Sequence, residues 1–148
     1  MKLSTYNISR AKVNQNLIIE KDKVKILFGW LGTIILLLII PIKLFRFFEI
    51  SYKSQLIIGI APSLLGPAGL LLLILSSKSK HLNLSIIQSA ILVALIALGI
   101  EFAQLLPRPE ILKYIHYNFD WLDVISSLIS VTIAYLFAKF LINYLRDK

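Results

Sequence analysis

Four long apolar stretches divide the chain, and their lengths indicate its structural class. They carry almost no charge: one acid lies near the end of the third stretch and another at the start of the fourth. A helix needs roughly 20 apolar residues, usually about 17–25, to cross the hydrocarbon core of a bilayer. The stretches lie at 26–42, 56–75, 84–106 and 121–138. This pattern predicts an all-α, polytopic membrane protein: a polar N-terminal tail at 1–25 and one membrane domain at 26–148, a bundle of four transmembrane helices.

The composition supports this class and excludes several others. Hydrophobic residues make up 57% of the 148 residues and charged residues only 16%, against about 25% charged in soluble domains. A soluble chain this short could not bury so much apolar surface, and intrinsic disorder is excluded for the same reason. The unbroken apolar runs do not alternate as the strands of a membrane β-barrel would. The absence of cysteine excludes a disulfide scaffold, a cysteine zinc site and a thiol nucleophile.

The basic residues indicate how the chain is oriented in the membrane. Cytoplasmic loops carry an excess of Lys and Arg. With a cytoplasmic N-terminus, ten basic residues lie inside, in the tail, the second loop and the C-terminal end, and five lie outside in the other two loops. We therefore expect both termini in the cytoplasm. The segment after the first apolar stretch offers no small-residue cleavage site, so that stretch is expected to remain as an anchor.

Polar residues gather where the third and fourth stretches meet the predicted outer surface. Glu101, Gln104 and Arg108 are spaced to share one face of a helix. Glu101 is expected about 7–8 Å below the end of its stretch, where a carboxylate is costly and should face other helices. Asp120 and Asp123 open the fourth helix. Each has a purely structural alternative: Asp120 as a helix cap, Arg108 as an ion-pair partner, and Glu101 as a neutral, hydrogen-bonded carboxyl.

The second stretch contains helix-breaking residues at a matching depth. Pro62, Gly66, Pro67 and Gly69 fall within eight residues, so we expect the backbone hydrogen bonds to be broken or the helix to be kinked there. Ser63 is expected close to the depth of Glu101. Freed carbonyls and the serine hydroxyl would then line a cavity that contains the acid. The alternative is close packing of helices at small residues.

The remaining chemically interesting residues have simpler interpretations. His81 and His116 lie in different loops, predicted on opposite sides of the membrane, so they form no metal pair. We expect neither a metal nor a cofactor. Phe119 and Trp121 fit an interfacial aromatic belt. The positive net charge of +8 lies next to the membrane with no folded domain behind it, so no nucleic-acid partner is expected.

The polar residues around the third loop form a pattern that resembles the signature region of the VanZ-like membrane proteins. That pattern has an acid and a glutamine three apart, then an arginine, then one or two aspartates that open the next helix. The matching positions are Glu101, Gln104, Arg108, Asp120 and Asp123. The resemblance covers roughly residues 56–138, and the chain differs from the usual pattern in having Ser127 and Ser130 in place of asparagine and glycine. It implies a small, multi-pass protein of the bacterial plasma (inner) membrane, in a family associated with glycopeptide-antibiotic resistance.

These observations lead to two main hypotheses about function. In the first, the chain is a non-enzymatic protein of the cell envelope that binds a lipid headgroup or cell-wall precursor at the outer leaflet. The expected ligand-binding residues are Ser63, Glu101, Gln104, Arg108, Asp120 and Asp123. In the second, it is a membrane enzyme acting on a phosphorylated lipid, with Glu101 or Asp123 as general base or with the three acids holding Mg²⁺. Membrane lipids are the expected partners, and a transporter or a self-associating structural protein is a third alternative.

Overall fold

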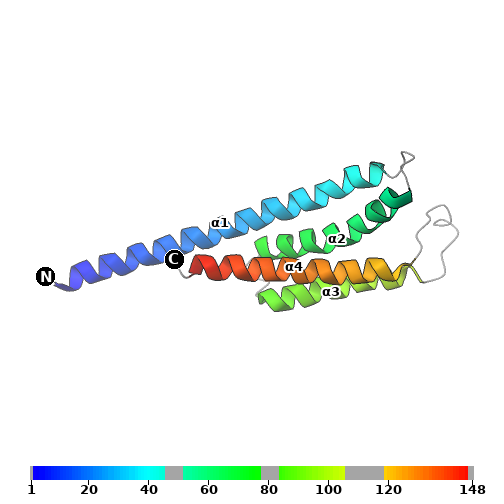
Figure 1. Ribbon diagram of the computed structural model, residues 1–148. Helices are drawn as coiled ribbons and strands as arrows, with labels where there is room; N and C mark the ends of the chain where they lie inside the picture. Colours follow the sequence, from blue (N-terminus) through cyan, green and yellow to red (C-terminus); the bar gives the residue numbers. More distant parts are fainter. Residues whose placement is uncertain (1, 46–51, 78–83, 106–118, 147–148) are drawn as a thin grey trace.

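The computed structural model describes residues 2–45, 52–77, 84–105 and 119–146, and these form four α-helices with no strand among them (Figure 1). The helices are α1 (Lys2–Phe45), α2 (Tyr52–Ser76), α3 (Ile86–Ala103) and α4 (Trp121–Arg146). The predicted all-α class is confirmed.

Each helix contains a segment long and apolar enough to cross a membrane. These candidate spans are Asp22–Leu44, Gly59–Ser76, Ile86–Ala103 and Trp121–Tyr144. Large apolar side chains point away from the bundle along them: Trp30 is 67% exposed, Leu95 62% and Phe140 68%. Such surfaces are costly in water and favourable against acyl chains. The chain is therefore a multi-pass membrane protein with four candidate spans.

The first and last helices are longer than their apolar stretches. The segment predicted as a polar tail is helical, because α1 begins at Lys2 and continues without interruption to Phe45. The first half of α1 projects beyond the other helices (Figure 1). Likewise, α4 continues past the predicted end at 138 to Arg146. The added segments contain no glycine or proline, so nothing in them terminates a helix.

The third helix is shorter than predicted, and both of its ends have clear causes. Ser85 caps its N-terminus: the Gln88 amide N–H donates to Ser85 Oγ at 3.2 Å, and the Ser85 amide N–H donates to Gln88 Oε1 at 2.8 Å. The helix ends at Ala103 rather than Leu106. Pro107 has no amide N–H to donate to the Ala103 carbonyl, so the helical ladder cannot continue.

The bundle is organised around α2, which packs against each of the other three helices, while α4 also packs along α3. The backbones of α1 and α2 approach each other closely at two glycines, Gly32 and Gly69. A Cβ atom built on Gly32 would lie 2.8 Å from the carbonyl oxygen of Gly69. Small residues permit this close approach between membrane helices. The alternative of small-residue packing on α2 is thus realised at Gly69.

The helices alternate in direction, which decides where the polar residues gather. The beginning of α1 and the end of α4 lie on the same side (Figure 1). The ends of α1 and α3 and the beginnings of α2 and α4 therefore meet on the other side. The candidate site lies at that second end.

Candidate functional site

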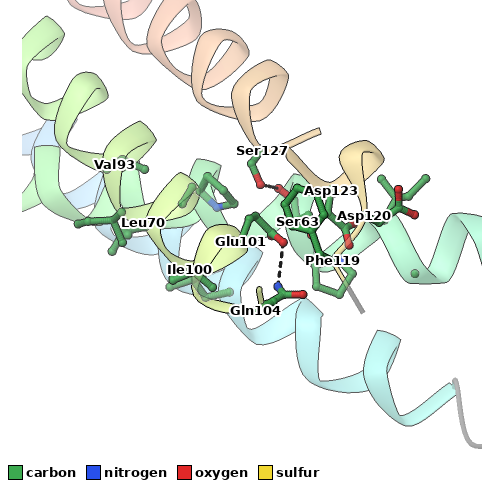
Figure 2. A pocket seen from close by; sticks show the side chains of 18 of the residues that line it. Ser63, Leu70, Val93, Ile100, Glu101, Gln104, Phe119, Asp120, Asp123 and Ser127 are labelled. Atoms are coloured by element: carbon green, nitrogen blue, oxygen red, sulfur yellow. Dashed lines mark hydrogen bonds between the residues drawn. The ribbon is translucent and has the colours of Figure 1, made fainter. Parts of the chain in front are cut away.

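A cleft of about 850 Å³ opens at the end of the bundle where α3 ends and α4 begins (Figure 2). All four helices contribute to its walls. Its lining residues are Leu36, Lys43, Gly59, Ile60, Pro62, Ser63, Gly66, Pro67, Leu70, Val93, Ile96, Ala97, Ile100, Glu101, Gln104, Phe119, Asp120, Asp123 and Ser127.

The wall of this cleft changes from apolar to polar along the bundle. Leu70 and Val93 lie at the inner end, and Glu101 and Gln104 lie toward the mouth (Figure 2). On α3 the lining runs from Val93 to Gln104, which at 1.5 Å per residue is roughly 16 Å of helix. The cleft thus reaches well into the hydrocarbon layer while its polar end lies near the boundary.

Glu101 is the most buried ionisable side chain of the cleft, with only 6% of its surface exposed. It lies in the last turn of α3, where Gln104 is three residues away on the same face. Gln104 Nε2 donates to Glu101 Oε2 at 2.8 Å (Figure 2). The Ser63 side chain of α2 lies close enough to interact with the same carboxyl group. The acid faces the bundle rather than lipid, as the cost of a buried carboxylate predicted.

Asp123 brings a second carboxylate to the same cleft. It lies in the first turn of α4 and is half-buried. It is near enough to Glu101 for the two charges to repel each other. Within the part of the chain that the structure describes, the Asp123 side chain has no hydrogen-bond or ion-pair partner. A ligand with donor groups would supply what this side chain lacks.

Asp120 has the structural role that was one of its two alternatives. Its Oδ1 accepts from the amide N–H of Leu122 at 2.9 Å, which caps α4. The side chain is exposed at the mouth of the cleft. Among the described residues, no three of His, Cys, Asp or Glu are placed to hold a metal ion. The hypothesis that three acids hold Mg²⁺ therefore has no support in this geometry.

Two serines of α4 form hydrogen bonds with the backbone of α2 around Pro67. Pro67 has no amide N–H for the Ser63 carbonyl, and Ser127 Oγ donates to that carbonyl instead at 3.1 Å (Figure 2). One turn further, Ser130 Oγ donates to the Leu64 carbonyl and accepts from the Ala68 amide N–H at 3.1 Å. Both serines are almost fully buried.

The prediction for α2 was a broken hydrogen-bond ladder or a kink, and the ladder is disturbed around Pro67 without ending the helix. The helix remains continuous from Tyr52 to Ser76 with both prolines inside. The carbonyls of Ser63 and Leu64 are freed from the normal ladder, as expected, but they are bonded to α4 rather than open to the cleft.

The structure gathers five of the six predicted ligand-binding residues around one cleft. These are Ser63, Glu101, Gln104, Asp120 and Asp123. The sixth, Arg108, lies outside the described residues, so its position in the predicted shared helix face is not seen. The described helix ends at Ala103, four residues before Pro107.

Sequence reasoning missed two contributors to the cleft. Lys43, at the end of the first span, was used only to judge orientation, yet it lines the polar end. Its position next to the same membrane boundary as Glu101 was the available signal. Phe119 was assigned to an aromatic belt but also lines the cleft, where its ring stacks on Phe102 with centroids 6.0 Å apart and meets Trp121 edge to face.

Comparisons of this chain with protein-family models, curated proteins and solved structures found no match.

Proposed function

We propose that this multi-pass membrane protein is VanZ-like and binds the headgroup of a lipid or of a lipid-linked cell-wall precursor at the outer leaflet. The observation that carries the proposal is the cleft of about 850 Å³, apolar at its inner end and polar at its mouth. Ligand pockets typically measure about 300–1,000 Å³. An amphipathic cavity at a membrane boundary matches an amphipathic ligand.

The walls suggest how such a ligand would lie. Its chain would contact Leu70, Val93 and their apolar neighbours in the inner half of the cleft. Its headgroup would lie among the carboxylates and amide of Glu101, Gln104 and Asp123, where donors of the ligand find acceptors. Lys43 supplies a cation at the same end for an anionic group of the ligand. In the proposal Arg108 adds a second cation from the following loop.

The outer leaflet follows from the charge distribution along the chain. The cleft lies at the end of the bundle away from the start of α1 and the end of α4. With both termini in the cytoplasm, as the excess of basic residues predicts, that end faces outward. A bacterial plasma membrane and a contribution to glycopeptide resistance are parts of the proposal that rest on the VanZ-like pattern.

Lipid retention by cleft-filling variants tests the proposal. A Cβ atom on Gly59 would meet no atom within 4 Å, and Gly59 lines the cleft. Gly59→Leu therefore adds an apolar side chain to the wall of the cleft at a position where its Cβ meets no other atom. Because overpacking an occupied site costs about 1–3 kcal/mol, lipid affinity should fall roughly tenfold. Native mass spectrometry in detergent measures the retained lipid.

Gly99→Leu is the matched control, since Gly99 also has open space around it, lies on α3 and does not line the cleft. The control should retain lipid as the wild type does. Equal retention by wild type and Gly59→Leu would refute binding in the cleft. Two further variants, Glu101→Ala and Arg108→Ala, test the proposed function as a whole. It would be refuted if both are well expressed and show the glycopeptide susceptibility and lipid binding of the wild type.

The catalytic alternative keeps one supporting observation, because the carboxylates of Glu101 and Asp123 face the same cleft. It then requires one of them to act as general base on the bound lipid. Chemical change of a phosphorylated lipid by the purified protein, lost in Asp123→Asn, would establish this alternative over binding alone.

A further inference from the structure

We propose that the cleft selects an amphiphile whose headgroup carries an ammonium group, with the ammonium held between Glu101 and Asp123. This inference rests on the proposed binding function and names the chemistry of its ligand. It also differs from a phosphate-centred site, in which basic side chains would dominate the polar end.

The charges of the described lining favour a cation. Glu101, Asp120 and Asp123 are acidic, and Lys43 is the basic residue among them. Asp120 points its Oδ1 at the start of α4, so two carboxylates remain to face the cleft. A headgroup with only negative charge would meet this pair unfavourably, whereas an ammonium would be attracted by both.

The two carboxylates of the cleft lie near each other without a cation between them among the described residues. Glu101 is almost fully buried and Asp123 half-buried, and their charges repel each other. Gln104 donates a hydrogen bond to Glu101, and Ser63 also interacts with that carboxyl group. Asp123 has no hydrogen-bond or ion-pair partner among the described residues. A cation between the two would replace repulsion by attraction. An ammonium group has three N–H donors, so it can serve both carboxylates at once.

The size and walls of the cleft point to an organic cation rather than a metal ion. Among the described residues, no group of three acidic, histidine or cysteine side chains is close enough together to bind a metal ion. Moreover, the same cleft of about 850 Å³ continues inward past Leu36, Leu70 and Val93. A small soluble amine would leave that apolar half empty, whereas the acyl chain of a lipid fills it. The expected ligand thus joins an ammonium headgroup to an acyl chain, with Lys43 beside any phosphate that connects them.

Lipid competition in detergent tests this inference. Purified full-length protein is titrated with phosphatidylethanolamine or phosphatidylglycerol of identical acyl chains, and bound lipid is counted by native mass spectrometry. We expect phosphatidylethanolamine to bind roughly tenfold more tightly, as a charge-assisted hydrogen bond implies. Both Asp123→Asn and Glu101→Gln should lose this preference, so that each variant binds the two lipids with about equal affinity.

Asp22→Asn is the matched control. Asp22 is an exposed acid on α1, 3.4 Å from the Nζ atom of Lys25, and it does not line the cleft. It should keep the wild-type preference.

The outcomes separate this inference from the proposed function. If the wild type binds phosphatidylglycerol as tightly as phosphatidylethanolamine or more tightly, the ammonium selectivity is overturned. If binding is still lost in Gly59→Leu, that result is consistent with a lipid site in the cleft. Failure of both lipids to bind would overturn the proposed function as well. Displacement of phosphatidylethanolamine by an equal concentration of free ethanolamine would overturn the requirement for an acyl chain.

Discussion

The contact between α2 and α4 allows a quantitative test of how Pro67 is accommodated. Pro67 cannot donate to the Ser63 carbonyl, and Ser127 Oγ takes over that role at 3.1 Å. Ser127 is only 2% exposed, so removing its hydroxyl leaves a buried carbonyl without a donor. The Ser127→Ala variant should therefore be destabilised through a single, identifiable backbone group.

The expected magnitude follows from two opposing considerations. An unsatisfied buried polar group costs about 1–3 kcal/mol. Hydrogen bonds between membrane helices, however, contribute only about 0.6 kcal/mol on average and about 1.7 kcal/mol at most. Because the Ser63 carbonyl has no other donor in the ladder, we expect the upper part of that range, about 1–2 kcal/mol for Ser127→Ala.

The same substitution should be much less harmful when residue 67 can donate. In a Pro67→Ala background, the alanine amide N–H can bond the Ser63 carbonyl, and the serine becomes dispensable. The cost of Ser127→Ala should then fall below about 0.5 kcal/mol, giving a coupling energy of about 1 kcal/mol between Ser127 and Pro67.

The coupling energy is obtained from reversible unfolding in mixed micelles. The free energy of unfolding is measured for the wild type, both single variants and the double variant. Thr132→Ala is the control on α4, because its Oγ1 bonds the Leu128 carbonyl of its own helix and is exposed. If Ser127→Ala costs as much in the Pro67→Ala background as it does in the wild-type chain, the proposed repair of the ladder is refuted.

Two further predictions concern the positions that hold the bundle and its site in place. Gly32→Ala should lower the free energy of unfolding by about 1–3 kcal/mol, because the new Cβ would lie 2.8 Å from the Gly69 carbonyl oxygen and force the helices apart. Thermal unfolding in detergent measures this loss. A loss no larger than that of the control Gly99→Ala would contradict the prediction. Asp120→Ala should cost about 0.5–2 kcal/mol in the same assay because the Leu122 amide loses its cap; Asp120→Ser should recover most of it, and lack of recovery would show that charge rather than capping matters.

Much of the fold could be predicted from the sequence because the signals are local. The four spans follow from apolar length, which depends on no tertiary contact. The hydrogen bond between Glu101 and Gln104 follows from their spacing on one helix. The errors were also local in origin: α1 and α4 extend beyond their apolar stretches because no residue terminates them, and α3 ends early because of Pro107.

The site could be predicted only in part, because it joins residues of different helices. The sequence predicted that Ser63 and Glu101 share a depth, since depth is counted along each span. Three other features depend on which helices are neighbours and how each is rotated. Asp123 faces Glu101 without a partner among the described residues, Lys43 lines the same cleft, and Ser127 bonds a carbonyl of α2. Apolar surfaces of membrane helices are nearly interchangeable, so hydrophobicity sets the number of spans but not their lateral order. Side-chain packing and hydrogen bonds between helices decide that order, and only the tertiary structure reveals it.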